Sequence, residues 1–63
     1  MVSVLILNIL KENIGRRVGF FSQHDFYFEG IILAVDDQFL QYNDRIKGIR
    51  VISLDEIKEV TLK

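Results

Sequence analysis

The stretch that most constrains the fold is residues 26–43, FYFEGIILAVDDQFLQYN. Its aromatic and β-branched residues favour a pleated, half-buried surface over a helix. The run is too long for one flat strand, and Asp36-Asp37 provides turn-forming side chains within it. Gly30 indicates a sharp bend or a close approach of another backbone. We therefore expect a bent strand at residues 26–35, a turn at Asp36-Asp37 and a further strand at residues 38–43.

The segments around this run continue the strand pattern. Residues 16–22 predict a first strand, followed by a tight turn at residues 23–25. Residues 44–47 form a polar turn, and residues 48–54 and 57–62 predict the fourth and fifth strands, joined by Asp55-Glu56. The chain thus supplies five short strands whose short connections suit antiparallel neighbours.

The first residues predict a helix at residues 4–13. Ser3 can cap its N-terminus and Gly15 can end it. A strand is the alternative, because Val2, Val4 and Ile6 lie at alternate positions. The apolar face of the helix is wider than a small sheet needs, which leaves side chains for contact with another subunit: Val4, Leu7 or Ile14.

One helix followed by five short antiparallel strands, the second strongly bent, predicts a single domain over residues 1–63. Its expected architecture is mainly β, a small open or closed barrel of the SH3-like or OB-like kind. The leading helix and the short connections favour the SH3-like kind. A chain of 63 residues buries only part of its surface, yet 49% of it is hydrophobic and its mean hydropathy is +0.21. Domains of this size are usually reinforced by a disulfide, a metal or oligomerisation. The chain has no cysteine and one histidine, so we expect oligomerisation.

The formal net charge of -1 and the pI near 5.7 provide no global basic field, so contact with nucleic acid depends on local arrangement. The N-terminal apolar run is too short to span a bilayer and lacks the flanks of a signal peptide. We therefore expect a cytoplasmic protein without membrane contact. Asp36-Asp37 is assigned to turn formation and His24 to a solvated turn. We expect no enzymatic activity, cofactor, metal site or small-molecule substrate.

Residues 10–18, LKENIGRRV, combine the end of an apolar helix with a glycine, basic residues and a valine. Residues 28–36, FEGIILAVD, combine a glycine with an alternating strand that ends in an acidic residue. The first stretch resembles the start of the barrel in Sm and Sm-like (LSm) proteins, and the second resembles the first Sm motif. The resemblance covers nearly the whole chain. It implies the Sm fold, homo-oligomeric rings of six or seven subunits joined through the fourth and fifth strands, and binding of single-stranded RNA rich in uridine or adenine.

In that family, the loop after the second strand provides an aspartate, a stacking side chain and an asparagine that contacts the base. Counted from Gly30, the amide position falls on Leu40. Counted from the loop pattern, Asp37, Phe39 and Gln41 take the three positions, and a bulge absorbs one extra residue. We favour the second register because it leaves fewer polar side chains in the core. Core packing for Phe39 and a solvated strand position for Gln41 are the alternatives.

The family's second motif places Arg-Gly between the last two strands. Here Ser53 and Leu54 occupy those positions, Arg50 lies nearby but earlier, and the Lys-His pair of the bacterial relative Hfq is missing. Asp55 and Glu56 beside this position repel a phosphate. The candidate RNA-binding residues are therefore Asp37, Phe39, Gln41, Ser53 and Arg50.

Arg16 and Arg17 are further candidates for contact with RNA phosphates or with the C-terminal end of the helix, and a simple surface role is the alternative. Two functions remain open. The favoured one is an Sm-like ring that binds single-stranded RNA. The alternative is an Sm-fold ring that serves as a structural or protein-interaction scaffold and has lost the usual base pocket.

Overall fold

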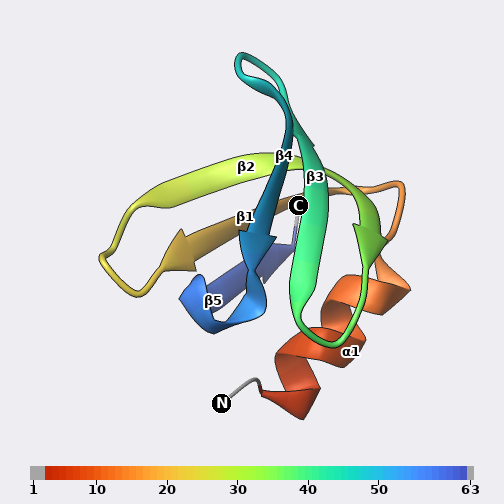
Figure 1. The fold of residues 1–63 in the computed structure, drawn as a ribbon, viewed down its shortest axis with the longest axis vertical. Helices are drawn as coiled ribbons and strands as arrows, with labels where there is room; N and C mark the ends of the chain where they lie inside the picture. Colours follow the sequence, from red (N-terminus) through yellow and green to blue (C-terminus); the bar gives the residue numbers. More distant parts are fainter. Residues whose placement is uncertain (1–2, 63) are drawn as a thin grey trace.

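The computed structural model describes residues 3–62 and contains one helix followed by five β-strands (Figure 1). The order of elements and the mainly β class agree with the sequence-based prediction. Observed boundaries differ from the predicted ones by one residue or less, and the connection before the last strand is a short 3-10 turn. The elements are α1 (Val4–Glu12), β1 (Arg17–Ser22), β2 (Tyr27–Val35), β3 (Phe39–Asp44), β4 (Gly48–Ser53), η1 (Leu54–Glu56) and β5 (Ile57–Leu62).

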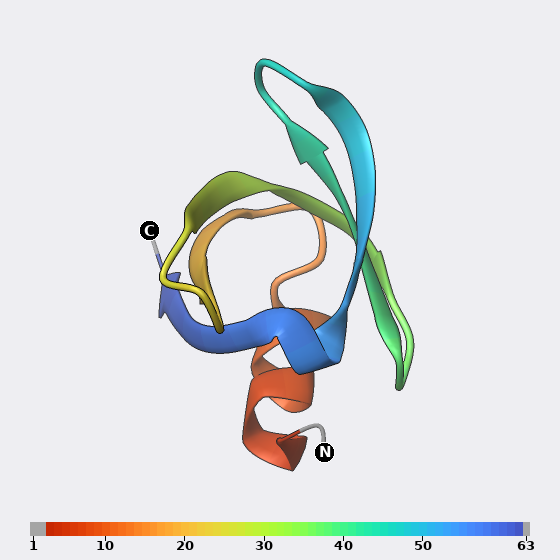
Figure 2. The same ribbon diagram turned by 60° about the vertical axis from the view of Figure 1, so that its left-hand side comes forward.

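All five strands belong to one antiparallel sheet with the order β4-β3-β2-β1-β5. The sheet curls around an interior, and the β3–β4 hairpin projects beyond it (Figure 2). Of the open and closed forms that the sequence predicts, the closed barrel is wrong, because β4 and β5 are the two edges and do not pair with each other within residues 3–62. A closed barrel requires hydrogen bonds between the two edge strands of its sheet.

Gly30 allows β3 to approach β2 closely, as expected from its place inside the strand. A Cβ atom at this position would lie 2.6 Å from the backbone oxygen of Asn43 and 2.8 Å from the ring of Tyr42. The register between β2 and β3 then shifts between Ile32 and Ala34, so Leu33 has no partner on β3. The strand therefore contains a bulge, as the register with Asp37, Phe39 and Gln41 requires.

The core lies on the concave inner face of the sheet. Side chains from β1, β2 and β3 alternate into it, and the ring of Phe20 meets the ring of Tyr42 edge to face at 5.2 Å between centroids. Leu10 of α1 is fully buried against the same cluster, so the helix covers one end of the curled sheet (Figure 1). The buried apolar residues are Leu10, Val18, Phe20, Ile32, Leu40, Tyr42, Leu54 and Ile57.

The helix begins and ends as the sequence predicts. The Ser3 hydroxyl accepts a hydrogen bond from the backbone N–H of Ile6 at 3.3 Å, and Gly15 adopts a left-handed conformation with φ of 88°. The strand alternative is excluded for residues 4–6, which are helical, while Val2 lies outside the described residues. No helix within residues 3–62 is long and apolar enough to cross a membrane.

Of the three side chains predicted to contact another subunit, two lie on the surface and one packs against the core. Val4 and Ile14 are exposed, whereas Leu7 is half-buried and packs against the core cluster. The helix therefore turns only part of its apolar surface inward.

Candidate nucleic-acid interface

The candidate site lies on the outer face of the sheet, which is the face turned away from the core. Along β3, Leu40 and Tyr42 point into the core, and Phe39 and Gln41 therefore point outward. Leu40 is 0% exposed, so it is a core residue and cannot present a group to a ligand. In the structure, Gln41 is the outward amide, as in the favoured register.

A shallow depression of about 280 Å³ surrounds these outward side chains, and we call it the Phe39 depression. Phe39 is 48% exposed, which argues against the alternative that its ring belongs to the core. Gln41 lies directly between Ala34 of β2 and Val51 of β4. The depression thus combines an open aromatic ring with an amide between apolar neighbours. Its lining is Ala34, Val35, Asp36, Phe39, Gln41 and Val51.

The turn between β2 and β3 is shaped by Asp36. Its Oδ1 accepts hydrogen bonds from the backbone N–H groups of Gln38 at 2.8 Å and Phe39 at 2.7 Å. These two bonds hold the pKa of the Asp36 carboxyl below its ordinary value. Asp37 follows at the exposed tip of the turn. The predicted turn-forming role therefore falls on Asp36, and Asp37 remains open to solvent beside Phe39.

The positions of the second motif have structural roles. Ser53 lies opposite Phe39 on β4, and its hydroxyl accepts a hydrogen bond from the backbone N–H of Asp55 at 3.3 Å. Leu54 is buried, and its N–H donates to the backbone oxygen of Gln38 at 2.9 Å. Arg50 lies opposite Tyr42, so it belongs to the inner-face row of β4. The structure gathers Asp37, Phe39, Gln41 and Ser53 at one end of β3 and places Arg50 apart from them.

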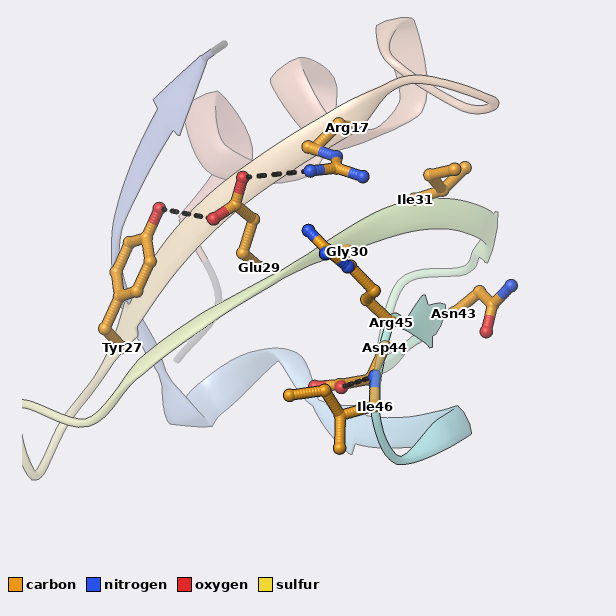
Figure 3. A pocket seen from close by; sticks show the side chains of 9 residues that line it. All are labelled: Arg17, Tyr27, Glu29, Gly30, Ile31, Asn43, Asp44, Arg45 and Ile46. Atoms are coloured by element: carbon orange, nitrogen blue, oxygen red, sulfur yellow. Dashed lines mark hydrogen bonds and ion pairs between the residues drawn. The ribbon is translucent and has the colours of Figure 1, made fainter.

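A larger cleft of about 550 Å³ lies at the other end of β3, under the β3–β4 hairpin (Figure 3). We call it the Arg45 cleft. Sequence reasoning missed most of its residues, although the alternation of Gln41, Asn43 and Arg45 was a usable signal, because alternate residues of a strand share a face. Its lining is Arg17, Tyr27, Glu29, Gly30, Ile31, Asn43, Asp44, Arg45 and Ile46.

Glu29 joins two side chains of the Arg45 cleft. Its Oε1 accepts a hydrogen bond from the Tyr27 hydroxyl at 3.5 Å, and its Oε2 lies 3.7 Å from Nη1 of Arg17 (Figure 3). The Tyr27 ring lies against Gly19, where a Cβ would come within 2.3 Å of the phenolic oxygen, and 5.0 Å from the ring of Phe21. The missing side chain at position 19 therefore allows the tyrosine to lie on the sheet.

Asp44 is occupied by the hairpin turn. Its Oδ1 accepts hydrogen bonds from the backbone N–H groups of Ile46 at 2.8 Å and Lys47 at 3.0 Å, and these bonds lower the pKa of its carboxyl. Arg45, the next residue, is exposed and makes no hydrogen bond or ion pair with another of residues 3–62. Its guanidinium is therefore available to a ligand.

Groups that could hold a metal do not gather in the described part of the chain, where no three His, Asp or Glu side chains come together. His24 lies in the exposed turn after β1, and its backbone N–H donates to the hydroxyl of Ser22 at 3.2 Å. The arrangement that the outer face does offer consists of stacking surfaces, amides and guanidinium groups.

Comparison of the chain with protein-family models, with curated proteins and with solved structures finds no match. Function is therefore inferred from the sheet edges and from the two outer-face pockets.

Proposed function

We propose that this chain is the subunit of a homo-oligomeric ring with the Sm fold, and that the ring binds single-stranded RNA. The observation that carries the proposal is the pair of open sheet edges, β4 and β5. Each edge strand is six residues long, and the two stand at opposite ends of one curved sheet. A β4 edge of one copy can therefore add to the β5 edge of the next.

Edge chemistry supports this association. Ile49 and Val51 of β4 are 62% and 60% exposed, and Leu62 at the end of β5 is also exposed. Open edges are normally blunted by charge, proline or a covering element. The chain contains no proline, and the exposed charges on the two edge strands are Arg50 of β4 and Lys58 and Glu59 of β5. Pairing of unlike edges is a head-to-tail contact, which closes into a ring when the rotation between copies allows it.

The small core adds a thermodynamic reason for assembly. Within the described residues, 3–62, eight apolar residues form the buried core, whereas twelve large apolar side chains are exposed. A domain of this size buries a limited fraction of its surface when alone. Association through the edges would remove part of the exposed apolar surface from water and add roughly 25 cal/mol per Å² before the cost of association.

The Phe39 depression supports the RNA half of the proposal. Proteins that bind single strands stack bases on aromatic side chains and contact base edges with amides. Phe39 and Gln41 supply one group of each kind on the same face, with Ala34 and Val51 as apolar walls. Among residues 3–62 no Lys or Arg lines this depression, so stacking and amide hydrogen bonding provide its contribution.

The scaffold alternative has its own support in the second motif. Ser53 caps the 3-10 turn and Leu54 belongs to the core, so neither position presents a cation to a base or phosphate. If the Phe39 depression binds no base, the ring is a scaffold without RNA. The two functions share the same assembly and differ in whether the ring binds single-stranded RNA.

Native mass spectrometry of the wild type and two variants tests the ring. Val51→Lys places a charge on the β4 edge and should release subunits. Leu33→Lys is the matched control, because Leu33 is also exposed but lies on β2, away from both edges. A monomeric wild type at micromolar concentration would refute the ring.

Fluorescence anisotropy with labelled oligo-U and oligo-A tests the RNA half. The proposal predicts binding that weakens when Phe39 is replaced by alanine. A ring that binds neither oligonucleotide at low salt would leave the scaffold as the function.

A further inference from the structure

We propose that the Arg45 cleft is a second nucleotide site, which holds the base and phosphodiester next to the nucleotide at the Phe39 depression. The inference rests on the RNA half of the proposed function and adds a site, a direction along β3 and the cations that the first site lacks. Its ligand is one nucleotide unit of a single strand.

The two pockets follow one another along the outer face of β3. Gln41 and Asn43 are two residues apart on the same face, which separates them by roughly 7 Å along the strand. Ala34 and Val51 flank Gln41, and Ile31 and Ile49 flank Asn43 in the same way. An amide between two apolar side chains therefore occurs twice in succession, which suits successive units of a polymer.

Two guanidinium groups converge on the cleft from different elements. Arg17 comes from β1 and Arg45 from the β3–β4 turn, and both point toward the same space (Figure 3). Glu29 already faces Arg17 at 3.7 Å, so the guanidinium group that a further anion would neutralise is that of Arg45. A phosphate accepts hydrogen bonds from guanidinium groups in a bidentate manner, so it fits this space.

The two carboxylates of the cleft are already engaged. Glu29 accepts from Tyr27 and faces Arg17, and Asp44 accepts two backbone N–H groups of the hairpin turn. Arg45 therefore has no carboxylate partner within residues 3–62, although two acidic residues line the same cleft. An incoming phosphate supplies the missing anion.

The remaining lining suits a base. Tyr27 is 44% exposed and lies against the backbone at Gly19, so its ring is a fixed platform with an accessible surface. Asn43 lies on the far side of Arg45 from Tyr27 (Figure 3), and its side chain carries both a donor and an acceptor for a base at that end of the cleft. The cleft volume of about 550 Å³ falls within the range of pockets that hold small organic ligands, which includes a nucleotide.

The test compares Arg45→Gln with Lys47→Gln in anisotropy titrations of labelled oligo-U and oligo-A over a salt series. Both substitutions remove one positive charge from the same hairpin, but Lys47 does not line the cleft. We expect Arg45→Gln to weaken binding roughly tenfold and to reduce the slope of log K against log salt by about 0.7, the value for one phosphate contact on a single strand. Lys47→Gln should change affinity less than about twofold.

Three outcomes would overturn the inference. Equal losses in the two variants would assign the effect to the general field of the hairpin. If Arg45→Gln binds the oligonucleotide as tightly as the wild type while Phe39→Ala binds it more weakly, the second site is refuted. The proposed function would then still hold. A wild type that binds neither oligonucleotide would overturn both.

Two further measurements keep the result interpretable. Native mass spectrometry should give the same assembly for every variant, because Arg45 and Lys47 are exposed. Competition with UMP or AMP distinguishes a site for a strand from a site for a free nucleotide. If the mononucleotide displaces the oligonucleotide at an equal concentration of nucleotide units, the cleft is not a strand site. Asn43→Ala provides a second, uncharged substitution in the cleft and should also weaken binding.

Discussion

At each end of β3 an aspartate holds the turn with a single carboxylate oxygen. Asp36 Oδ1 accepts from the backbone N–H groups two and three residues later, and Asp44 Oδ1 does the same in the hairpin turn. The side chains beside the two turns differ, since Phe39 and Gln41 lie near the first while Arg17 and Arg45 lie near the second. Turn geometry is thus shared, and the outward side chains of each end determine what it can bind.

The largest effect should come from Leu40, the residue of β3 that lies beside Phe39 and Gln41 but points into the core. Leu40→Ala should lower the free energy of unfolding by about 2 to 5 kcal/mol, because it leaves a cavity in the core. Gln41→Ala, one residue further along and outward, should change it by less than about 0.5 kcal/mol. Urea denaturation followed by circular dichroism measures both, and equal losses would contradict the division between the faces of β3.

The next effect separates the stacking end from the core. Phe39→Ala should weaken oligonucleotide binding by about 1 to 3 kcal/mol while the assembly persists, because a base loses its aromatic platform. Anisotropy titration and native mass spectrometry on the same sample provide the two readings. Loss of assembly or folding without a separate effect on RNA would make Phe39 a structural residue.

Salt dependence should distinguish the two ends. Phe39→Ala should leave the slope of log K against log salt unchanged, because stacking releases no counterions. Arg45→Gln should reduce that slope by about 0.7, because one phosphate contact is lost. Titrations at four or more salt concentrations measure the slopes. A smaller slope in Phe39→Ala would show that the two ends are not separate in their chemistry.

The smallest effect concerns the two aspartates. Folding lowers the pKa of Asp36 and of Asp44 below the ordinary value of 3.8 through hydrogen bonds from backbone N–H groups. Their stabilisation is therefore present above pH 3.8 and is lost as the pH falls through the lower folded values. Asp36→Asn and Asp44→Asn keep an accepting oxygen but remove this titration.

Between about pH 4 and pH 2 each asparagine variant should lose less stability than the wild type does. The reduction in this acid loss should be similar for the two variants. The urea midpoint as a function of pH measures this. An unchanged acid loss in the double variant would show that the turn aspartates do not contribute, and unequal effects would show that the two turns are not equivalent.

Much of this arrangement could be predicted from local sequence rules. Ser3 caps the start of the helix, and Gly15 lies just beyond its C-cap, Asn13, in a left-handed conformation that turns the chain toward β1. Gly30 indicates the close approach of β3 because only a residue without Cβ fits there. These features depend on neighbouring residues, which is why the pattern reveals them. A bulge after Gly30 was needed only by the register that the resemblance to Sm proteins suggests, and the sequence did not place it at Leu33, where the structure has it.

The Arg45 cleft could not be predicted in the same way. It joins Arg17 of β1 with Tyr27 of β2 and Arg45 after β3, and it depends on how far the hairpin projects over the sheet. Whether the barrel is open or closed could not be predicted for the same reason, since the relation of β4 to β5 depends on the curvature of the whole sheet. Arg50 was placed with the site because it is close in sequence, but strand alternation puts it in the other row.

The most direct test of the ring is the mass of the intact assembly at micromolar concentration, measured by native mass spectrometry. The two open edges predict one closed species that Val51→Lys disrupts and Leu33→Lys preserves. The resemblance to Sm proteins implies six or seven copies. A wild-type chain that remains a monomer under these conditions would contradict the ring, and with it the function proposed for this protein.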